Sequence, residues 1–541
     1  MALRASGRIE VQRRLPGPLI FVLAALVVVA SLARGVTAEP TYTDAFYHFN
    51  AASRLARGDG FVEDYLWNYL DAPMELPAPS HRYWMPLTSI LAALGMAAFG
   101  APGDYHAAQA PFILLAAGAG IVAFETTRSL GGNRWNAWIA GLLTALGGFF
   151  APRWGAIDTF APYALIGSLA LLCCGKAMMR REGQWLYWVL AGGLAALGHL
   201  TRPDGLLLLI AACFAAIPAW GIIDLLRQRR WSVCPRPLLL VGMSYLLVML
   251  PWFARNIAAL GLILPTGGLQ GIRFSQYDDL FRYTATAVPA LALDERILRL
   301  LEVRWTAALH GFGTFVAVEG LIVLAPFMLI GWWLRRQHPL LRGFTALAIG
   351  IHVVMVLVFP LQGLRGGLFH AVAALFPFWM ALGVLGLDAA VEWAAKRRRT
   401  WNAEQAKRIF SIAVLGIGVL ISLSVVRSAL TEDRQDLPYL YRELRAVLPP
   451  GARVMINDPA RLYYHTGHGG VTIPNEPVQI VPEIAKRFRI DYLVLEHVGD
   501  GGYIGGGPAA FQFDVGSPPD FLRAVSIEAG SDLRLYQIAP S

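Results

Sequence analysis

Long apolar runs dominate the pattern of hydrophobic and polar positions along the chain. A helix that crosses a bilayer needs about 20 mostly apolar residues, and about eleven segments come close to or reach that length. Short polar stretches separate most of them. The pattern therefore predicts a polytopic α-helical membrane protein with about eleven spans. The predicted spans are 16–33, 107–126, 135–150, 160–178, 185–200, 205–225, 237–253, 312–334, 344–359, 368–389 and 409–425.

Composition supports this prediction. Of the 541 residues, 56% are hydrophobic and only 15% are charged, whereas soluble domains carry about 25% charged residues. The net charge of +9 would suit nucleic acid, but the basic residues gather in the short loops between apolar runs. We therefore expect membrane lipids around the chain and no nucleic-acid partner.

The basic loops also predict an orientation, because cytoplasmic loops carry the excess of Lys and Arg. They place the N-terminus in the cytoplasm and, with an odd number of spans, the C-terminus outside a plasma or inner membrane. One further apolar segment, 83–100, would split the basic loops between two faces if it crossed. We assign it to the outer side as a juxtamembrane or re-entrant helix. The basic residues are Arg13, Arg14, Arg128, Arg134, Arg180, Arg181, Arg227, Arg229, Arg230, Arg335, Arg336, Lys396, Arg397, Arg398 and Arg399.

Three large outer regions remain between and after the spans. The first outer loop covers about 34–106, and the second covers about 254–311, with a predicted interfacial helix at 294–305. From about residue 430 the composition becomes that of a soluble domain. It contains two predicted strands, 453–457 and 491–496, and a predicted helix, 481–487. The expected organisation is a transmembrane domain at 1–429 and a small extracytoplasmic α/β domain at 430–541.

The cysteines exclude a disulfide framework in these outer regions. Cys173, Cys174 and Cys213 lie in apolar runs, and Cys234 lies in a basic loop.

The first outer loop holds the most informative polar residue, Asp44. It follows the first span by a few residues, and Phe46, Phe49 and Leu55 allow an interfacial helix after it. Aspartate is a favoured helix N-cap, so local sequence leaves a cap and a catalytic carboxylate equally open.

A family resemblance bears on that choice. The stretch Asp44-Ala-Phe-Tyr-His48, followed by a polar loop and His81-Arg-Tyr-Trp-Met-Pro86, resembles the first external loop of GT-C glycosyltransferases. These include oligosaccharyltransferase catalytic subunits, protein mannosyltransferases and aminoarabinose transferases. The resemblance implies an inverting transfer of a sugar from a polyprenyl-phosphate or polyprenyl-diphosphate carrier at the outer leaflet. It also implies that Asp44 is the catalytic carboxylate, which would accept the acceptor's proton.

A second stretch, Ala151 to Asp158, resembles the external loop in which oligosaccharyltransferase subunits carry an Asp-x-Glu metal pair. Here Phe160 stands in place of the second acid. Hard cations need several oxygen ligands, so Asp44 and Asp158 alone make a weak metal site. We predict a metal-independent enzyme with no firm cofactor, and a divalent metal stays the less favoured alternative. Asp158 is equally open to capping the next helix.

The WWDYG-type acceptor motif of the oligosaccharyltransferase subunits is absent from the sequence. Transfer of a whole oligosaccharide to a peptide asparagine is therefore disfavoured.

Further polar residues at predicted outer span ends are candidates for the donor phosphate and for the acceptor or sugar. Arginine suits phosphate because it binds in a bidentate way, and interfacial snorkelling is the alternative. Glu319 is a candidate because an ionisable residue at membrane depth is functional by default. The phosphate candidates are Arg255, Arg365, Arg202 and His370. The acceptor or sugar candidates are Tyr47, His48, His81, Arg82, Asp158 and Glu319. Two more first-loop acids, Glu63 and Asp64, are expected to be solvated.

The leading hypothesis is a membrane glycosyltransferase that uses a polyprenyl-phosphate-linked sugar at the outer face. The acceptor is a lipid, a glycan or a protein. One alternative is a transporter or lipid flippase, which needs ionisable residues or broken helices deep in several spans. Another is a non-catalytic membrane scaffold with an outer sensor domain. The sequence predicts neither the sugar nor the oligomeric state.

Overall fold

A computed structural model gives the fold of the chain. It describes residues 17–36, 38–180, 182–217, 235–284, 293–398, 401–432, 437–496, 510–511, 513, 517–527 and 533–539. Among the predicted basic residues, Arg13, Arg14, Arg181, Arg227, Arg229, Arg230 and Arg399 lie outside this range, and so does Cys234.

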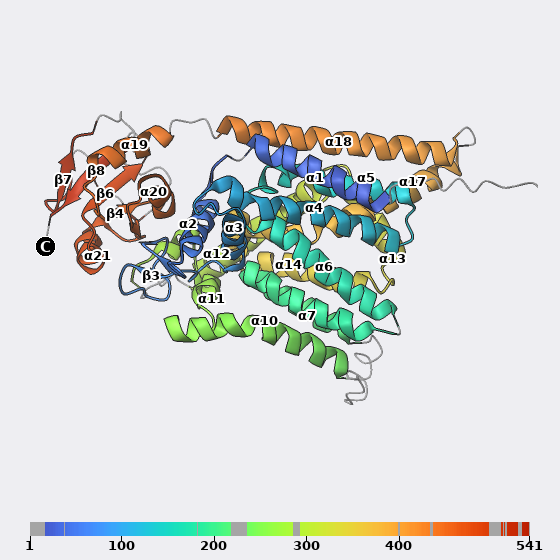
Figure 1. The fold of residues 1–541 in the computed structure, drawn as a ribbon, viewed down its shortest axis with the longest axis horizontal. Helices are drawn as coiled ribbons and strands as arrows, with labels where there is room; N and C mark the ends of the chain where they lie inside the picture. The colour runs from blue at the N-terminus through green and yellow to red at the C-terminus, as the bar shows by residue number, and fades with distance from the viewer. Residues whose placement is uncertain are drawn as a thin grey trace, which may run out of the picture.

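Long helices packed side by side form the body of the molecule, and a small sheet lies at one end (Figure 1). Shorter helices and turns connect the long helices or belong to the first outer loop and the C-terminal segment. The long helices are α1 (Gly17–Val36), α4 (Tyr105–Ser129), α5 (Arg134–Leu146), α6 (Phe160–Met179), α7 (Gln184–Thr201), α8 (Leu206–Ala216), α10 (Arg236–Leu260), α12 (Leu293–Thr314), α13 (Ala325–Arg335), α14 (Leu341–Val353), α17 (Phe376–Ala395) and α18 (Ala403–Glu432). The helices outside this body are α2 (Thr43–Arg57), α3 (Leu87–Ala98), α11 (Gly267–Gln270), α15 (Pro360–Gln362), α16 (Leu368–Ala371), α19 (Leu437–Val447), α20 (Pro459–Thr466) and α21 (Val481–Phe488). The 3₁₀ and π turns are η1 (Gly148–Arg153), η2 (Pro203–Gly205), η3 (Gly271–Arg273), η4 (Tyr277–Phe281), η5 (Phe315–Glu319), η6 (Val354–Val358), η7 (Gly363–Gly367), η8 (Val372–Ala374) and η9 (Val478–Ile480).

Within the described residues, six helices are long and apolar enough to cross a membrane. The predicted polytopic α-helical architecture is therefore confirmed, and the chain is a multi-pass membrane protein. Shorter apolar helices cover two of the other predicted spans, 16–33 and 205–225. The count of eleven spans stays a prediction.

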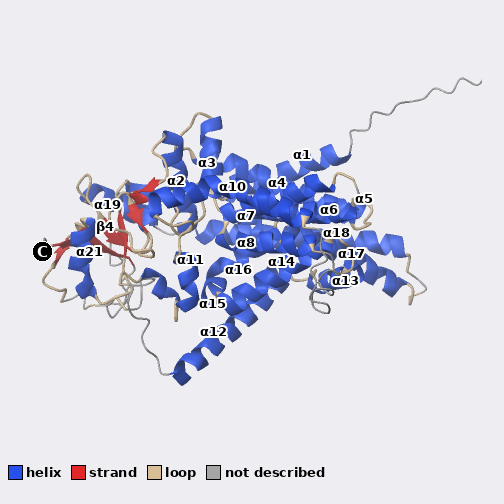
Figure 2. Ribbon diagram, turned by 90° about the horizontal axis from the view of Figure 1, so that it is seen from below, coloured by secondary structure: helices blue, strands red, loops and turns tan. Residues whose placement is uncertain are grey.

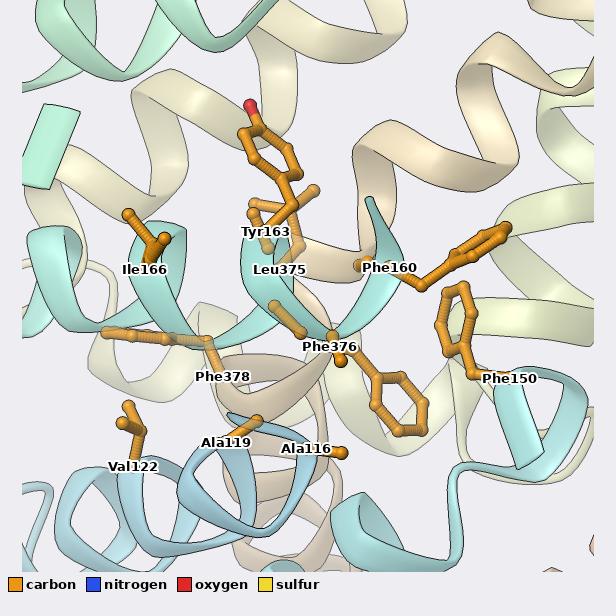
Figure 3. Packing of buried hydrophobic residues seen from close by; sticks show 14 of the residues in the cluster. Ala116, Ala119, Val122, Phe150, Phe160, Tyr163, Ile166, Leu375, Phe376 and Phe378 are labelled. Carbon is orange, nitrogen blue, oxygen red and sulfur yellow. The ribbon is translucent and has the colours of Figure 1, made fainter. Parts of the chain in front are cut away.

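The core of the bundle combines aromatic rings with small residues. The rings of Phe150, Phe160 and Phe376 pack together, with centroids 5.2 to 5.9 Å apart between Phe150 and the other two (Figure 3). Glycines allow the closest helix crossing, between α13 and α17. A Cβ at Gly331 would lie 2.0 Å from the Leu382 carbonyl oxygen, so only glycine fits there. Small residues at helix contacts are typical of membrane bundles.

One end of the bundle gathers basic helix ends. Lys176 at the end of α6 donates to Ser129 at the end of α4, and Arg335 at the end of α13 donates to the carbonyl of Leu130. The long helix α18 runs from the region of α17 and α13 to α19 beside the sheet (Figure 1). We call the two ends of the bundle the basic end and the sheet end.

The sheet joins the C-terminal segment to the first outer loop. Its strand order is β2-β5-β4-β6-β8-β7, with β2, β5, β4 and β6 parallel and the last two antiparallel. β4 and β6 occupy the two segments predicted as strands. β2 was not predicted, because two residues are too short for a hydrophobic pattern. The strands are β1 (Val62–Glu63), β2 (Tyr65–Leu66), β3 (Ala78–Pro79), β4 (Val454–Ile456), β5 (Gly470–Thr472), β6 (Tyr492–Glu496), β7 (Leu522–Val525) and β8 (Leu533–Ile538).

The region predicted as the eighth span, 312–334, is not one straight helix. α12 runs unbroken from Leu293 to Thr314. The segment 294–305, which was predicted as a separate interfacial helix, is therefore the first part of the same helix as the start of this region. After η5 the chain turns through Leu321 and Ile322, which have φ values of 44° and 63°, before α13 begins. α12 therefore projects at an angle from the bundle (Figure 2).

Candidate active site

Asp44 lies in the first turn of α2, at the sheet end of the bundle. Tyr42 precedes the helix, and no side chain caps it, so capping is not the role that the structure gives to Asp44. A carboxylate in the first turn still gains from the helix dipole. The indole of Trp84, from the end of the first loop, acts to lower the pKa of this carboxylate, against the larger effect of burial.

Asp158 is buried between η1 and α6. Its Oδ2 accepts a hydrogen bond of 2.7 Å from the Tyr42 hydroxyl, and its Oδ1 accepts one from the Thr159 backbone N–H. The Arg153 guanidinium lies 4.3 Å above the Tyr42 ring. Asp158 is thus held by the residue that precedes α2 and by the residue that precedes α6.

His370, on α16, completes a cluster with the two aspartates. One ligand atom each of Asp44, Asp158 and His370 lies within 4.8 Å of the others. The His370 Nδ1 is 2.9 Å from the Thr159 hydroxyl and 3.8 Å from the Asp158 Oδ1. Phe160, which replaces the expected second acid, stacks on the imidazole with a centroid distance of 3.9 Å. Phe160 therefore positions a third polar group in the cluster. We call these three residues the Asp44 cluster.

Two arginines from different elements flank the cluster. Arg202 forms a bidentate pair with Asp204, at 2.8 Å for each bond, and donates to the Gly367 carbonyl. Burial raises the pKa of Asp44, and the Arg202 charge acts in the opposite direction. Arg365 is exposed, and its guanidinium lies 4.9 Å over the ring of Tyr277.

The local backbone explains the position of Arg365. The helix breaks at this residue, and the next one, Gly366, has a φ of 103°, a conformation that glycine adopts at low cost. Because the ring of Tyr277 is close enough to Asp44 for the two to interact electrostatically, the break presents the Arg365 charge to the same region.

The two carboxylates of the cluster have pKa values that move apart. Burial raises the pKa of Asp44 to about 7, and the charge of Asp158 adds to this shift. Burial also acts to raise the pKa of Asp158, but the imidazoles of His370 and His48 and the bond from Tyr42 hold it below its usual value. Adjacent carboxyls with separated pKa values are an arrangement that suits a proton acceptor beside a permanent anion.

Several first-loop residues that were predicted to contact the acceptor or the sugar are buried. Ser89 bridges the rings of His48 and His81, at 3.0 Å from each, and Tyr47 stacks on Trp84. These side chains pack the first loop, and their predicted contact with acceptor or sugar stays a prediction.

Arg82 and Arg255 hold backbone carbonyls of the first loop. Arg82 donates to the carbonyl of Asp71 and lines a cavity of about 350 Å³ between the loop and the end of α10. Arg255 donates to the carbonyls of Phe61 and Ser80, at 3.0 Å each.

Glu319 belongs to a different cluster. Its Oε2 accepts a 2.6 Å hydrogen bond from the Trp379 indole, and its Oε1 lies 3.1 Å from the His352 Nε2. The side chain is fully buried where the span breaks at η5. We call these three residues the Glu319 cluster.

The structure also brings in a residue that the sequence did not single out. The Thr43 hydroxyl donates a 2.6 Å hydrogen bond to Asp458, which also caps α20. Asp458 therefore brings the C-terminal segment to the residue before Asp44. The sequence offered no signal for this contact, because 415 positions separate its partners.

The Asp44 cluster also supplies enough closely spaced ligand atoms for a metal site. Two carboxylates and an imidazole suit Zn²⁺ or Mn²⁺ better than Mg²⁺, and the spacing of the ligand atoms allows one ion between them. From the sequence, only Asp44 and Asp158 were candidate metal ligands, because His370 was assigned to the phosphate.

No protein-family model matches the sequence, and no curated protein matches it. Solved structures do match its fold. The oligosaccharyltransferase AglB from Archaeoglobus fulgidus, in complex with an inhibitory peptide and a dolichol-phosphate, aligns with a TM-score of 0.52 at 12% identity. The match covers 88% of this chain and 69% of AglB. ArnT from Cupriavidus metallidurans, bound to undecaprenyl phosphate, aligns with a TM-score of 0.53 at 15% identity over 96% of this chain and 97% of ArnT. The resemblance found in the first loop is thus confirmed at the level of the fold: this chain has the fold of the GT-C glycosyltransferases.

Proposed function

We propose that this chain is a membrane glycosyltransferase that moves a sugar from a polyprenyl-phosphate-linked donor to a lipid, glycan or protein acceptor. The observation that carries the proposal is the Asp44 cluster, which lies at one end of a bundle with the GT-C fold. The solved structures support the donor class, because AglB is in complex with a dolichol-phosphate and ArnT is bound to undecaprenyl phosphate.

Asp44 is the proposed catalytic base. As the acceptor oxygen bonds to the anomeric carbon, its proton passes to the Asp44 carboxylate. The bond from that carbon to the carrier phosphate breaks at the same time, and the phosphate leaves with the electron pair. Attack opposite the leaving group inverts the anomeric centre. A base whose pKa lies near 7 is well matched to such a proton transfer.

Arg365 and Arg202 are the proposed ligands of the departing phosphate. Arg365 has no hydrogen bond to another described residue and is exposed beside Tyr277, so its donors can reach a ligand. Arg202 already binds Asp204 and would act mainly through its charge. A divalent ion, when bound by Asp44, Asp158 and His370, would add positive charge for the leaving phosphate.

We also propose that the sheet end faces outward from the plasma or inner membrane and the basic end faces the cytoplasm. The clustering of Lys176 and Arg335 at one end of the bundle supports this orientation. The count of eleven spans and the domain boundary near residue 430 belong to the same proposal.

An Asp44→Asn variant tests the function directly. Membranes that contain the wild type, Asp44→Asn or the control Asp59→Asn are supplied with a panel of polyprenyl-phosphate sugars. Asp59 is an exposed acid just beyond the same helix. We expect Asp59→Asn to retain the wild-type rate and Asp44→Asn to lose at least a hundredfold. Equal transfer by Asp44→Asn and wild type would overturn the assignment.

The Glu319 cluster is the observation that favours a transporter as the second candidate function, because it places an ionisable pair at a helix break. A transporter would lose activity in Glu319→Gln and keep it in Asp44→Asn. The glycosyltransferase would show the reverse.

A further inference from the structure

The first turn of α2 is held at two consecutive residues, from two different parts of the molecule. The Tyr42 hydroxyl donates a 2.7 Å hydrogen bond to Asp158, which belongs to the bundle. The Thr43 hydroxyl donates a 2.6 Å hydrogen bond to the Oδ2 of Asp458, which belongs to the C-terminal segment. Asp44 is the next residue along the chain. The turn that carries this carboxylate is therefore fixed both to the bundle and to the C-terminal segment.

Asp458 uses its two carboxylate oxygens for two different helices. Its Oδ1 accepts a 3.1 Å hydrogen bond from the backbone N–H of Arg461 and so caps α20. Its Oδ2 accepts the hydrogen bond from Thr43. A helix N-cap needs one side-chain oxygen, which serine or asparagine supplies as well as aspartate does. Capping alone therefore does not explain the second oxygen, which joins α20 to α2.

The bond to Thr43 is one of several contacts between α2 and α20, which lie beside each other (Figure 1). The ring of Phe46 packs against the ring of Tyr464, with centroids 5.2 Å apart. The Asn50 side chain donates a 2.8 Å hydrogen bond to the Ala460 carbonyl. Positions 43, 46 and 50 recur at helical spacing and so share one side of α2. α20 therefore lies along this side, and the Thr43 bond is the contact at its N-terminal end.

The Asp44 side chain leaves α2 on a neighbouring side, because successive residues of a helix are about 100° apart. There it joins Asp158 and His370 in the Asp44 cluster. A shift or rotation of the first turn would move the Asp44 carboxylate relative to the other two groups. The Thr43 bond opposes such a movement because it holds the residue directly before Asp44.

We propose that Asp458 is a positioning residue, which fixes the first turn of α2 through Thr43 and so holds the Asp44 carboxylate in place for transfer. The proposal rests on the proposed function in so far as Asp44 is the base. Asp458 itself accepts no proton from the acceptor and binds no substrate. Its loss should therefore lower kcat and leave KM nearly unchanged, because a misplacement of about 1 Å at a reacting group costs up to about a hundredfold in rate.

The first test changes the Thr43 side of the bond and measures kcat and KM in membranes. Thr43→Val keeps the shape of the side chain and loses the donor, so we expect kcat to fall about tenfold and KM to change less than twofold. Thr43→Ser keeps the donor and should stay within about threefold of wild type. The control Glu483→Gln, which changes an exposed acid of the same C-terminal segment, should match wild type.

The second test changes the Asp458 side. Asp458→Ser keeps one oxygen for the cap of α20 and loses the oxygen that binds Thr43, so its kcat should match that of Thr43→Val. Asp458→Asn keeps the cap through its carbonyl, and its amide can donate to the Thr43 hydroxyl. Its kcat should therefore stay within about threefold of wild type. The double variant Thr43→Val/Asp458→Ser should be no slower than either single variant, because all three lose the same bond.

An Asn50→Ala variant separates positioning of Asp44 from docking of the C-terminal segment as a whole. Asn50 is buried, and it also donates to the Tyr65 hydroxyl. Its removal should therefore lower the denaturant midpoint of unfolding more than Thr43→Val does. Because this bond is nearly two turns from Asp44, kcat should fall less than threefold.

Hydrogen exchange of the peptide that covers residues 42–50 reports the state of the turn without any activity. The backbone N–H of Phe46 donates a 3.0 Å hydrogen bond to the Tyr42 carbonyl, which closes this turn. In the full-length protein in detergent, exchange should be faster in Thr43→Val and Asp458→Ser than in wild type. Exchange in Thr43→Ser should match wild type.

Three results would overturn the proposal. One is a folded Thr43→Val with wild-type kcat or wild-type exchange at 42–50, and another is an equal loss of kcat in Thr43→Val and Asn50→Ala. The third is a loss of kcat in Asp458→Asn as large as that in Asp458→Ser, which would mean that Asp458 acts through its charge. Failure of the proposed function gives a different result: Asp44→Asn would be active, whereas exchange at 42–50 would still respond to Thr43→Val.

Discussion

The Asp44 and Glu319 clusters both combine carboxylate and imidazole groups, but they differ in how far their charges are satisfied. One Glu319 oxygen accepts from the Trp379 indole, the other lies 3.1 Å from the His352 Nε2, and the side chain is fully buried. The Asp44 cluster brings two carboxylates together, and beside it stands an exposed arginine with unused donors. An ionisable residue at depth is a functional candidate by default. The comparison favours the Asp44 cluster as the proposed site of chemistry, because its charges are less completely paired although both clusters are buried.

The largest expected difference between the clusters is in the rate of transfer. Asp158→Asn should lower kcat by roughly a hundredfold, because it removes the anion that, together with burial, keeps the pKa of Asp44 high. Glu319→Gln keeps an acceptor for the Trp379 indole and should stay within threefold of wild type. Measured kcat values for the two variants in the same membranes check this. A larger loss in Glu319→Gln would break the distinction.

The loss of folding stability should show the reverse order, with the Glu319 variant more destabilised than the Asp158 variant. Glu319→Ala leaves His352 and the Trp379 indole without their buried partner, which costs about 3 kcal/mol. Asp158→Asn should cost less than about 1 kcal/mol, since Asn can still accept from Tyr42. Denaturant unfolding in detergent gives both values. If Asp158→Asn is the less stable variant, the Asp44 cluster is the structural one.

The pH dependence of the transfer rate should reflect the ionisation of the Asp44 carboxyl group. Its pKa is raised from 3.8 to about 7, and the base works only when ionised. The rate should therefore rise with pH to a midpoint near 7 and level off above it. The same shift has the opposite sign for stability, because the folded state favours protonated Asp44. Its contribution is present below about pH 4 and is lost as the pH rises towards 7. A rate independent of pH between 5 and 8 would contradict the base assignment.

The smallest expected effect is a metal-dependent change in melting temperature. An ion that binds only the folded state stabilises it, so Mn²⁺ or Zn²⁺ should raise the Tm of wild type by about 2–4 °C. His370→Ala should abolish the shift, and Glu319→Gln should keep it. A shift that persists in His370→Ala would place the ion elsewhere, and no shift in wild type would favour the metal-independent enzyme.

Hydropathy alone was enough to predict the helical bundle, because the bilayer imposes long apolar runs. The site was only partly predictable. Asp44 could be picked out because a resemblance singled out its loop, whereas the grouping with His370 joins residues from three distant segments. Glu63 was misjudged because its polar neighbours suggested solvent, whereas it is buried, and its burial depends on strands of two residues. A local pattern carries no information about such contacts.

The edge strand β2 has a consequence for how the protein is made. Tyr65 and Leu66 pair with Gly470 and Val471, and Thr43 pairs with Asp458. The ribosome therefore completes the first loop's partners only after the intervening helices have been synthesised. A nascent chain that stalls or is cut before β5 contains Asp44 but lacks the strand and the carboxylate that brace its loop. Completion of the first outer loop thus waits for synthesis of the C-terminal segment.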